Sequence, residues 1–315
     1  MKFSGVGGQA VMEGVMMRNK DYYAVAVRKP DKEIEVKVSE YEGIIKNKRI
    51  RKIPVLRGMI AFVESLYLGM STLMYSASFF EDEEESKESN SRESITKNDS
   101  LKESNSQGIM IAGTVIVSIL LAVGLFFVLP YFISIFFEKF IKSNFFVVFL
   151  EGITRLVIFI LYISLISFTP DIKRVYMYHG AEHKCINCIE HGHKLTVENV
   201  RKSSKHHKRC GTSFLILVMM ISIVFFMFIQ FDSHIVKLLV RLICVPLIAG
   251  VSYEFIQLAG KNDNKFIDLV SAPGLWMQRI TTKEPDDDMI EVGIASVEAV
   301  FDWSKWQKEQ RIYDL

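Results

Sequence analysis

The sequence predicts a mainly α-helical, polytopic membrane protein with about four transmembrane helices, a small cytosolic β-hairpin region and a cytosolic tail. Half of the 315 residues are hydrophobic. Long apolar runs fill much of the chain between residues 109 and 259, and the charges are segregated along the sequence. A soluble protein of this composition would need an unusually apolar core, so these features favour a membrane protein.

Four apolar runs are each close to or above the roughly 20 residues that a helix needs to cross the hydrocarbon core of a bilayer. They are 109–137, 145–169, 213–231 and 238–259. We expect them to form two helical hairpins within a membrane domain spanning 108–260.

The basic residues predict the orientation of these spans. The loop at 170–210 holds nine Lys and Arg residues, whereas the connectors at 138–144 and 232–237 hold two and one. By the positive-inside rule, the large loop and both termini are expected in the cytosol, with the spans in the plasma membrane.

The N-terminus lacks a charged start followed by an apolar run, so we expect no cleavable signal peptide. The formal net charge of +2 gives no indication of a nucleic-acid partner.

The N-terminal region, 1–53, is expected to contain a β-hairpin. Residues 22–29 and 33–40 alternate in polarity on either side of the turn signal Pro30–Lys32. The glycine-rich stretch at 5–18 has no phosphate-loop spacing, so a tight backbone turn is expected there.

Three further segments flank the spans. Residues 54–80 have helical spacing but are too polar for a span, which predicts an amphipathic or partly inserted helix. The segment 81–107 is expected to be a disordered linker, because nine acidic and four basic residues lie within 81–103 and no aromatic residue is present. The tail, 261–315, should contain a helix from about residue 291 that packs on the N-terminal hairpin or the membrane surface.

The loop at 170–210 contains a pattern typical of metal ligands. Tyr178–Lys184 reads H-x-x-E-H, with His179 and His183 four positions apart and Glu182 beside the second histidine. On a helix the two histidines share a face and can bind one divalent ion, and we expect this ion to be zinc. Glu182 can then act as the general base toward a water molecule whose pKa the ion has lowered.

Two alternatives compete with a catalytic metal site. Most surface histidines are simply solvated or make structural hydrogen bonds. Cys185, Cys188 and Cys210, with one histidine, could instead form a closed structural zinc site. The three motif residues and the seven histidines and cysteines that follow them make ten potential ligands within about 32 positions, and this density favours metal binding over the first alternative.

The third ligand of a catalytic site has three candidates in the sequence. Glu254 is an ionisable residue within an apolar run, which is costly unless paired or functional; a pair with Arg241 or Arg155 is equally compatible. His207, at the entrance to the third span, is the other main candidate, or a basic interfacial anchor. Cys210 follows His207 and completes the set.

Four motifs, in order along the chain, resemble the YqhQ-like family of bacterial membrane proteins. They are Gly7–Arg18, Tyr178–Lys184, His207–Phe214 and Ala272–Asp287. The resemblance implies a membrane fold and a metal-dependent enzyme of unknown activity. It carries the family's H-x-x-E-H onto His179, Glu182 and His183.

The same resemblance bears on the cysteines. The family's His-Pro-Arg-Cys-Gly-Thr motif falls on 207–212, with Lys208 where the family usually has proline. The family usually lacks a cysteine at the position of Cys185, which weakens the closed structural zinc site.

These observations favour a metal-dependent hydrolase at the cytosolic membrane face, with an unidentified substrate at the membrane surface. The alternatives are a metal-ion transporter or sensor in which Glu254 and Arg241 line a path, and a non-catalytic membrane scaffold. Membrane lipids are the expected partners, and a homo-oligomer is a further alternative.

Overall fold

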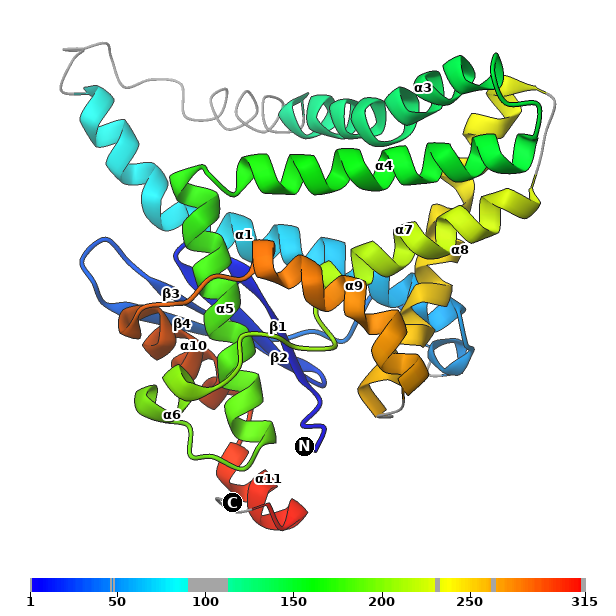
Figure 1. Ribbon diagram of the computed structural model, residues 1–315. Helices are drawn as coiled ribbons and strands as arrows, with labels where there is room; N and C mark the ends of the chain where they lie inside the picture. Colours follow the sequence, from blue (N-terminus) through cyan, green and yellow to red (C-terminus); the bar gives the residue numbers. More distant parts are fainter. Residues whose placement is uncertain are drawn as a thin grey trace. The chain divides into compact units, whose positions relative to one another are not determined.

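A computed structural model describes residues 2–45, 47, 49–89, 113–229, 233–261 and 265–312 (Figure 1). The chain is mainly helical with one antiparallel sheet, as the sequence predicts. It divides into two compact units, one formed by 1–81, 163–221 and 244–315, and the other by 82–162 and 222–243.

The first unit contains a four-stranded antiparallel sheet with the order β1-β2-β3-β4. Its strands are β1 (Val6–Val11), β2 (Gly14–Asn19), β3 (Tyr22–Arg28) and β4 (Ile34–Glu40). The predicted hairpin at 22–40 is therefore confirmed as β3 and β4, which pair from Tyr22↔Glu40 to Arg28↔Ile34.

The glycine-rich stretch at 5–18 contains the expected tight turn, and the structure adds that this turn joins the two strands of the β1–β2 hairpin. The strands join through Met12 and Glu13, and Glu13 adopts the left-handed conformation with φ of 47°. The glycines at 7, 8 and 14 hid the strand periodicity, yet Met16 and Met17 are buried. They belong to different hydrophobic cores, as neighbours in a strand should.

Each face of the sheet packs against helices. Val15, Met17 and Ala26 join a core with α5 (Pro170–Glu190), α6 (Val197–Lys202) and α10 (Asp287–Val300). Val11, Met16, Val25 and Val27 form the other core with Leu68 of α1 (Leu56–Ser89). The predicted packing of the C-terminal tail on the N-terminal strands is confirmed for α10, where the Ser296 hydroxyl donates to the Ala24 carbonyl at 3.0 Å.

The boundaries of several predicted segments change. The helix predicted at 54–80 is present as α1, but it continues to Ser89 because the run after residue 80 is rich in the helix former Glu. The rest of the predicted linker, 90–107, lies outside the described residues. The expected loop at 170–210 is largely helical, as α5 and α6.

The described part of the tail, 265–312, holds three helices rather than one. They are α9 (Lys265–Thr281), α10 and α11 (Trp303–Gln310). Asp286 caps the N-terminus of α10, because its side chain accepts a hydrogen bond from the Met289 backbone N–H. Asp302 caps α11 in the same way, with the Lys305 N–H as donor.

The described residues of the second unit are mainly helical. It holds Gly113–Glu138, which includes the π-helical turn η2 (Gly124–Val128) and α3 (Leu129–Glu138), and most of α4 (Asn144–Ile166). Within it, the buried carboxylate of Glu151 pairs with Arg155 at 3.1 Å and also with Arg241.

Four helices among the described residues are long and apolar enough to cross a membrane, close to the predicted runs. The first two are Gly113–Glu138 and Asn144–Ile166. The third is the whole of α7 (Gly211–Phe228), and the fourth is Ile235–Ala259 within α8 (His234–Lys261).

Candidate metal centre

Helix α5 presents the H-x-x-E-H residues on one face. Pro170 starts the helix, at a position where its missing N–H group is not needed. Glu182 and His183 follow His179 by three and four positions, so each of them lies about one helical turn from His179 on the same side of the helix. The helical placement assumed for the motif is therefore correct.

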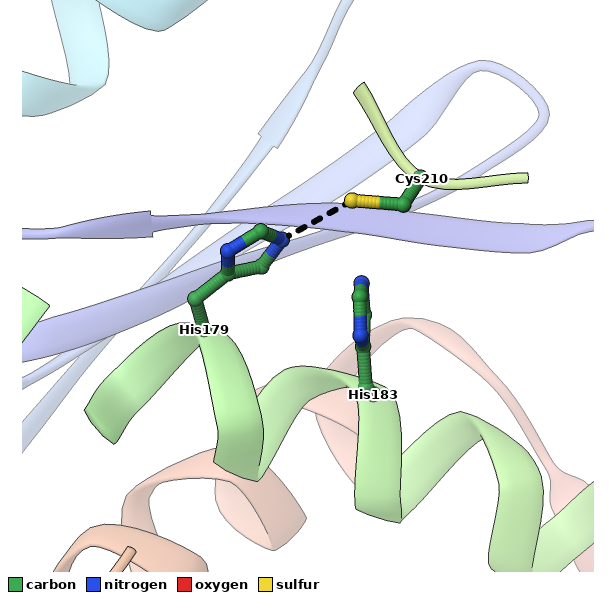
Figure 2. Close-up of side chains that lie close together, drawn as sticks. All are labelled: His179, His183 and Cys210. Carbon is green, nitrogen blue, oxygen red and sulfur yellow. Dashed lines mark hydrogen bonds between the residues drawn. The ribbon is translucent and has the colours of Figure 1, made fainter. Parts of the chain in front are cut away.

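Cys210 completes a three-residue cluster with the two histidines (Figure 2). One ligand atom each from His179, His183 and Cys210 lies within 4.8 Å of the others. The Nε2 atom of His179 is 3.2 Å from the Cys210 Sγ atom, and the two imidazole rings are 4.4 Å apart between centroids.

Backbone carbonyl groups orient both imidazoles. The Nδ1 atom of His179 bonds to the Thr281 carbonyl at 2.9 Å, and that of His183 to the Lys205 carbonyl at 2.6 Å. A carbonyl only accepts, so each Nδ1 carries a proton and donates it. Both Nε2 atoms therefore point toward Cys210, and that of His183 is buried without a hydrogen-bond partner.

Polar residues of α5 hold the loop that supplies one of these carbonyl groups. The Lys184 ammonium donates to the carbonyls of Arg201 and Ser203 at 2.8 and 3.0 Å. The Asn187 amide donates to those of Ser204 and His206 at 2.6 and 3.0 Å. These contacts fix Lys205 between them, and hence the ring of His183.

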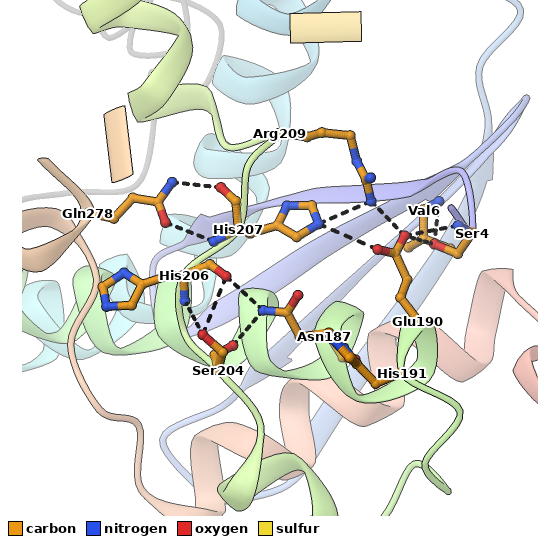
Figure 3. Close-up of polar contacts among 10 residues, drawn as sticks. All are labelled: Ser4, Val6, Asn187, Glu190, His191, Ser204, His206, His207, Arg209 and Gln278. Carbon is orange, nitrogen blue, oxygen red and sulfur yellow. Dashed lines mark hydrogen bonds and ion pairs between the residues drawn. The ribbon is translucent and has the colours of Figure 1, made fainter. Parts of the chain in front are cut away.

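Gln278 of α9 holds the next part of the loop (Figure 3). Its side-chain amide accepts from the His207 N–H at 2.9 Å and donates to the His207 carbonyl at 2.7 Å. The Cys210 Sγ atom in turn contacts the Thr212 N–H and hydroxyl, at 3.4 and 3.1 Å. The thiol is thus placed by α9 and by the first turn of α7.

The cluster shifts the protonation of its members. Burial alone would raise the pKa of Cys210, but the adjacent His179 and His183 imidazoles lower it well below its usual value. Burial opposes protonation of His179, yet the Cys210 sulfur outweighs this and raises the pKa of His179 to about 9. The three side chains together thus favour a thiolate beside charged imidazole.

Glu182 lies beside the cluster. Its carboxylate is 3.9 Å from the His179 Nε2 atom, and its side chain is buried. Burial raises the pKa of Glu182, although the two histidines and the Gly8 backbone oppose this. A Cβ atom at Gly8 would lie 3.1 Å from the Glu182 Cγ and collide with the Met16 carbonyl oxygen, so the glycine permits the close approach of β1 to α5.

His207 does not join the cluster, contrary to one of the predicted ligand sets. Its ring lies 5.6 Å from that of His183, but its Nε2 atom contacts Arg209 at 3.1 Å and lies 3.8 Å from Glu190 (Figure 3). The Glu190 Oε1 atom also accepts from Arg209 at 2.6 Å and from the Ser4 N–H at 2.9 Å. His207 is therefore part of a buried ionic network.

Glu254 is also engaged elsewhere, so the structure does not bring it to the cluster. Its Oε1 atom accepts from the Arg57 Nε at 2.7 Å and from the Val55 N–H at 3.1 Å. The expected structural pairs with Arg241 or Arg155 were also wrong, because both arginines bind Glu151.

Cys185 and Cys188 lie in the hydrophobic core formed by α5, α6 and α10. Among the described residues, the group of close ligand atoms includes Cys210 but neither of these thiols. The predicted closed structural zinc site with all three cysteines is therefore not formed in this part of the chain.

A cavity of about 320 Å³ reaches the cluster. Its wall includes His179, Glu182 and Cys210, together with Gly7, Gly8 and Gln9 of β1. A small molecule can thus reach the side of the cluster that faces β1.

The supporting residues were not identified from sequence. Gln278 and Thr281 lie within the fourth family motif, and Gly8 within the first, so the motifs located these segments without assigning them a role. Lys205 acts through its carbonyl group, which any residue type would provide. Its contribution therefore leaves no signal in the sequence.

Comparison with known proteins agrees with the predicted resemblance. Residues 53–303 match a family described as protein of unknown function (DUF1385). The chain is 33% identical over 291 residues to an uncharacterized protein, YqhQ, of Bacillus subtilis (strain 168), covering 92% of this chain and 90% of that protein. No solved structure matches. The chain therefore belongs to the DUF1385 family of proteins of unknown function.

Proposed function

We propose that this protein is a metal-dependent hydrolase of the plasma membrane, with a zinc-type ion held by His179, His183 and Cys210. The observation that carries the proposal is the convergence of two Nε2 atoms and one Sγ atom within 4.8 Å. Imidazole nitrogen and thiolate sulfur are ligands that zinc prefers, and three protein ligands leave a fourth position for water.

The hydrogen bonds around the cluster support metal ligation. Zinc-binding histidines usually donate their second N–H to a carbonyl or carboxylate, which fixes the ring and its tautomer. Thr281 and Lys205 provide such acceptors for His179 and His183. A cation would also give the buried, unpartnered Nε2 atom of His183 a ligand bond.

The charges of the cluster suit a divalent cation. The low pKa of Cys210 makes its sulfur available as thiolate. A cation would take the Nε2 lone pairs in place of protons, so ion binding would release protons from the histidines. One thiolate and the nearby Glu182 carboxylate then balance two positive charges.

Glu182 is suited to act as the general base. A bound zinc ion would supply Lewis acidity and lower the pKa of a coordinated water molecule toward neutrality. Glu182 can take a proton from the attacking water and return it to the leaving group. Its raised pKa, caused by burial, brings it closer to the value that such proton transfer favours.

A second candidate function is nucleophilic catalysis by Cys210. The 3.2 Å contact between the His179 Nε2 and Cys210 Sγ atoms is the spacing of a thiolate–imidazolium pair. This alternative leaves His183 without a chemical role, and it predicts activity in the presence of chelators. The metal hydrolase predicts loss of activity under the same condition.

The transporter alternative has less support. It requires Glu254 and Arg241 to line one path, yet Glu254 pairs with Arg57 and Arg241 with Glu151. The proposed cytosolic location of the site and both termini is supported by the nine basic residues at 170–210.

Metal content and turnover of the purified full-length protein test the proposal. We expect about one equivalent of zinc in the wild type, loss of zinc in His183→Ala, and retention in the control His191→Ala at the exposed end of α5. Glu182→Gln should keep zinc but lose turnover of chromogenic ester, amide or phosphate substrates. Wild-type protein without zinc, or full turnover in Glu182→Gln, would contradict the assigned roles.

A further inference from the structure

A second cavity in the first unit adjoins the one at the candidate metal centre. Its volume is about 540 Å³, and the two cavities share Gly7, Gly8, Gln9 and Arg209 in their walls. Strand β1 thus separates a space lined by Glu182 and Cys210 from a larger space over its other side. Because β1 is the edge strand and its residues line both cavities, a molecule bound in the larger cavity can extend past this edge toward Glu182 and Cys210.

The larger cavity is strongly basic. Its wall contains five cationic side chains and one carboxylate, that of Glu64. The cations are Arg18, Lys20, Arg51, Arg57 and Arg209. Basic clusters of this kind bind phosphate and carboxylate groups through charge-assisted hydrogen bonds.

Part of this charge lacks an acidic partner within the described chain. Arg51 pairs with Glu64, Arg57 with Glu254 and Arg209 with Glu190. Arg18 donates its Nε–H to the Lys20 carbonyl at 3.1 Å, and no carboxylate among the described residues pairs with Arg18 or Lys20. Two cations therefore remain to receive an anion.

The cavity lies beside helices that are suited to a membrane. Ile60, Ala61 and Leu68 of α1 form part of its wall. The same helix packs on two candidate spans: Phe62 contacts Phe214 of α7 with ring centroids 6.0 Å apart, and a Cβ at Gly58 would lie 2.6 Å from the Gly250 carbonyl of α8. The first part of α1 therefore lies against both of these helices.

The outer side of α1 carries a continuous apolar stripe. It consists of exposed side chains at helical spacing, namely Val63, Leu66, Tyr67, Met70, Leu73 and Met74. An exposed apolar stripe next to candidate spans favours contact with lipid acyl chains. The same helix therefore joins an apolar surface to a basic cavity.

We infer that the larger cavity binds the anionic headgroup of a phosphate-bearing membrane lipid, and that such lipids are the substrate class of the proposed hydrolase. The phosphate lies among Arg18, Lys20 and Arg51, and the acyl chains lie along the apolar stripe of α1. The assignment of a substrate rests on the proposed function, whereas the binding of the lipid does not.

Binding of a short-chain phosphatidic acid to the full-length protein in detergent tests the inference. We expect Arg18→Gln with Lys20→Gln to weaken this binding about tenfold, because two charge-assisted contacts are lost. The control Lys173→Gln with Lys308→Gln removes the same charge from exposed positions outside the cavity and should bind as the wild type does. Equal binding by all three proteins, or none by the wild type, would overturn the inference.

Two further ligands identify the source of the phosphate. The matching diacylglycerol, which lacks phosphate, should bind much more weakly than phosphatidic acid, and so should inorganic phosphate alone. If inorganic phosphate binds as tightly as the lipid, the lipid assignment is wrong. Zinc content measured in the same samples separates the two proposals, because lipid binding by a protein without zinc contradicts the hydrolase and retains the lipid site.

Discussion

The Nε2 atom of His179 lies 3.2 Å from the Sγ atom of Cys210, although 31 positions separate the two residues. His179 is fixed by the Thr281 carbonyl at the end of α9, and Cys210 by Thr212 at the start of α7. Three segments that are distant in sequence thus determine one contact. The geometry of the cluster therefore depends on how closely α5 packs on the segment after α9.

Gly180→Ala tests this dependence. A Cβ atom at Gly180 would collide with the Lys283 carbonyl oxygen and lie 3.4 Å from Pro285, so the segment that carries Thr281 must move away from α5. We expect zinc affinity to fall about 10- to 100-fold, as is typical when the group that orients a histidine ligand is displaced. Competition with a chromogenic chelator measures this affinity.

Gly211→Ala is the matched control, because a Cβ atom there meets nothing within 4 Å although the residue follows Cys210 directly. It should bind zinc as the wild type does. Unchanged affinity in Gly180→Ala would show that the Thr281 carbonyl does not orient His179.

Gly8→Ala tests the approach of β1 to α5. The added Cβ would lie 2.8 Å from the Met17 sulfur and 3.1 Å from the Glu182 Cγ atom, within a paired strand that cannot shift freely. Overpacking of this kind should destabilise the protein by about 1–3 kcal/mol. Thermal unfolding of the detergent-purified protein measures the effect.

Gly7→Ala provides the comparison on the same strand, where a Cβ meets nothing within 4 Å. It should unfold close to the wild-type temperature. If both variants have the same stability, Gly8 is not required for the contact between β1 and Glu182.

The sequence was sufficient for elements with local periodicity. The candidate spans, the β3–β4 hairpin and the shared face of His179 and His183 each follow from a repeat within a short segment. The β1–β2 hairpin was missed because Gly7, Gly8 and Gly14 interrupt the β-branched pattern, and α9 because Pro273 and Gly274, which are typical helix breakers, interrupt its apolar repeat.

The choice among the predicted ligands depended on long-range contacts. Glu254 appeared available because its partner Arg57 lies 197 positions earlier. His207 and Cys210 are equally close to the motif in sequence, and the Gln278 amide and Arg209 decide which of them faces the histidines. No local pattern encodes these contacts.

The pH dependence of stability tests the buried network at Glu190. Burial would raise the pKa of Glu190, but contacts with His207 and Arg209 outweigh this and lower the pKa from 4.5 to about 2. Because the folded-state pKa is depressed, the stabilisation is present above about pH 4.5 and is lost as pH falls toward 2. The shift corresponds to about 3 kcal/mol at neutral pH.

Glu190→Gln removes this ionisation. We expect the variant to be less stable than the wild type at pH 7, and the difference to shrink as pH falls from 4.5 toward 2. Denaturant unfolding followed by tryptophan fluorescence provides the comparison. A difference that stays constant over this range would exclude a charged Glu190 as the source of the stabilisation.

Cobalt substitution distinguishes Cys210 from the other thiols as a metal ligand. A thiolate bound to Co²⁺ gives a charge-transfer absorption in the near ultraviolet, and an alcohol oxygen does not. We expect the wild type to show this band, and Cys210→Ser to lose it while His179 and His183 retain weaker cobalt binding.

Cys185→Ser and Cys188→Ser should keep the band, because both thiols lie in the core between α5 and α10. Loss of the band in either of these variants, or its persistence in Cys210→Ser, would mean that the ion is held by a different set of ligands.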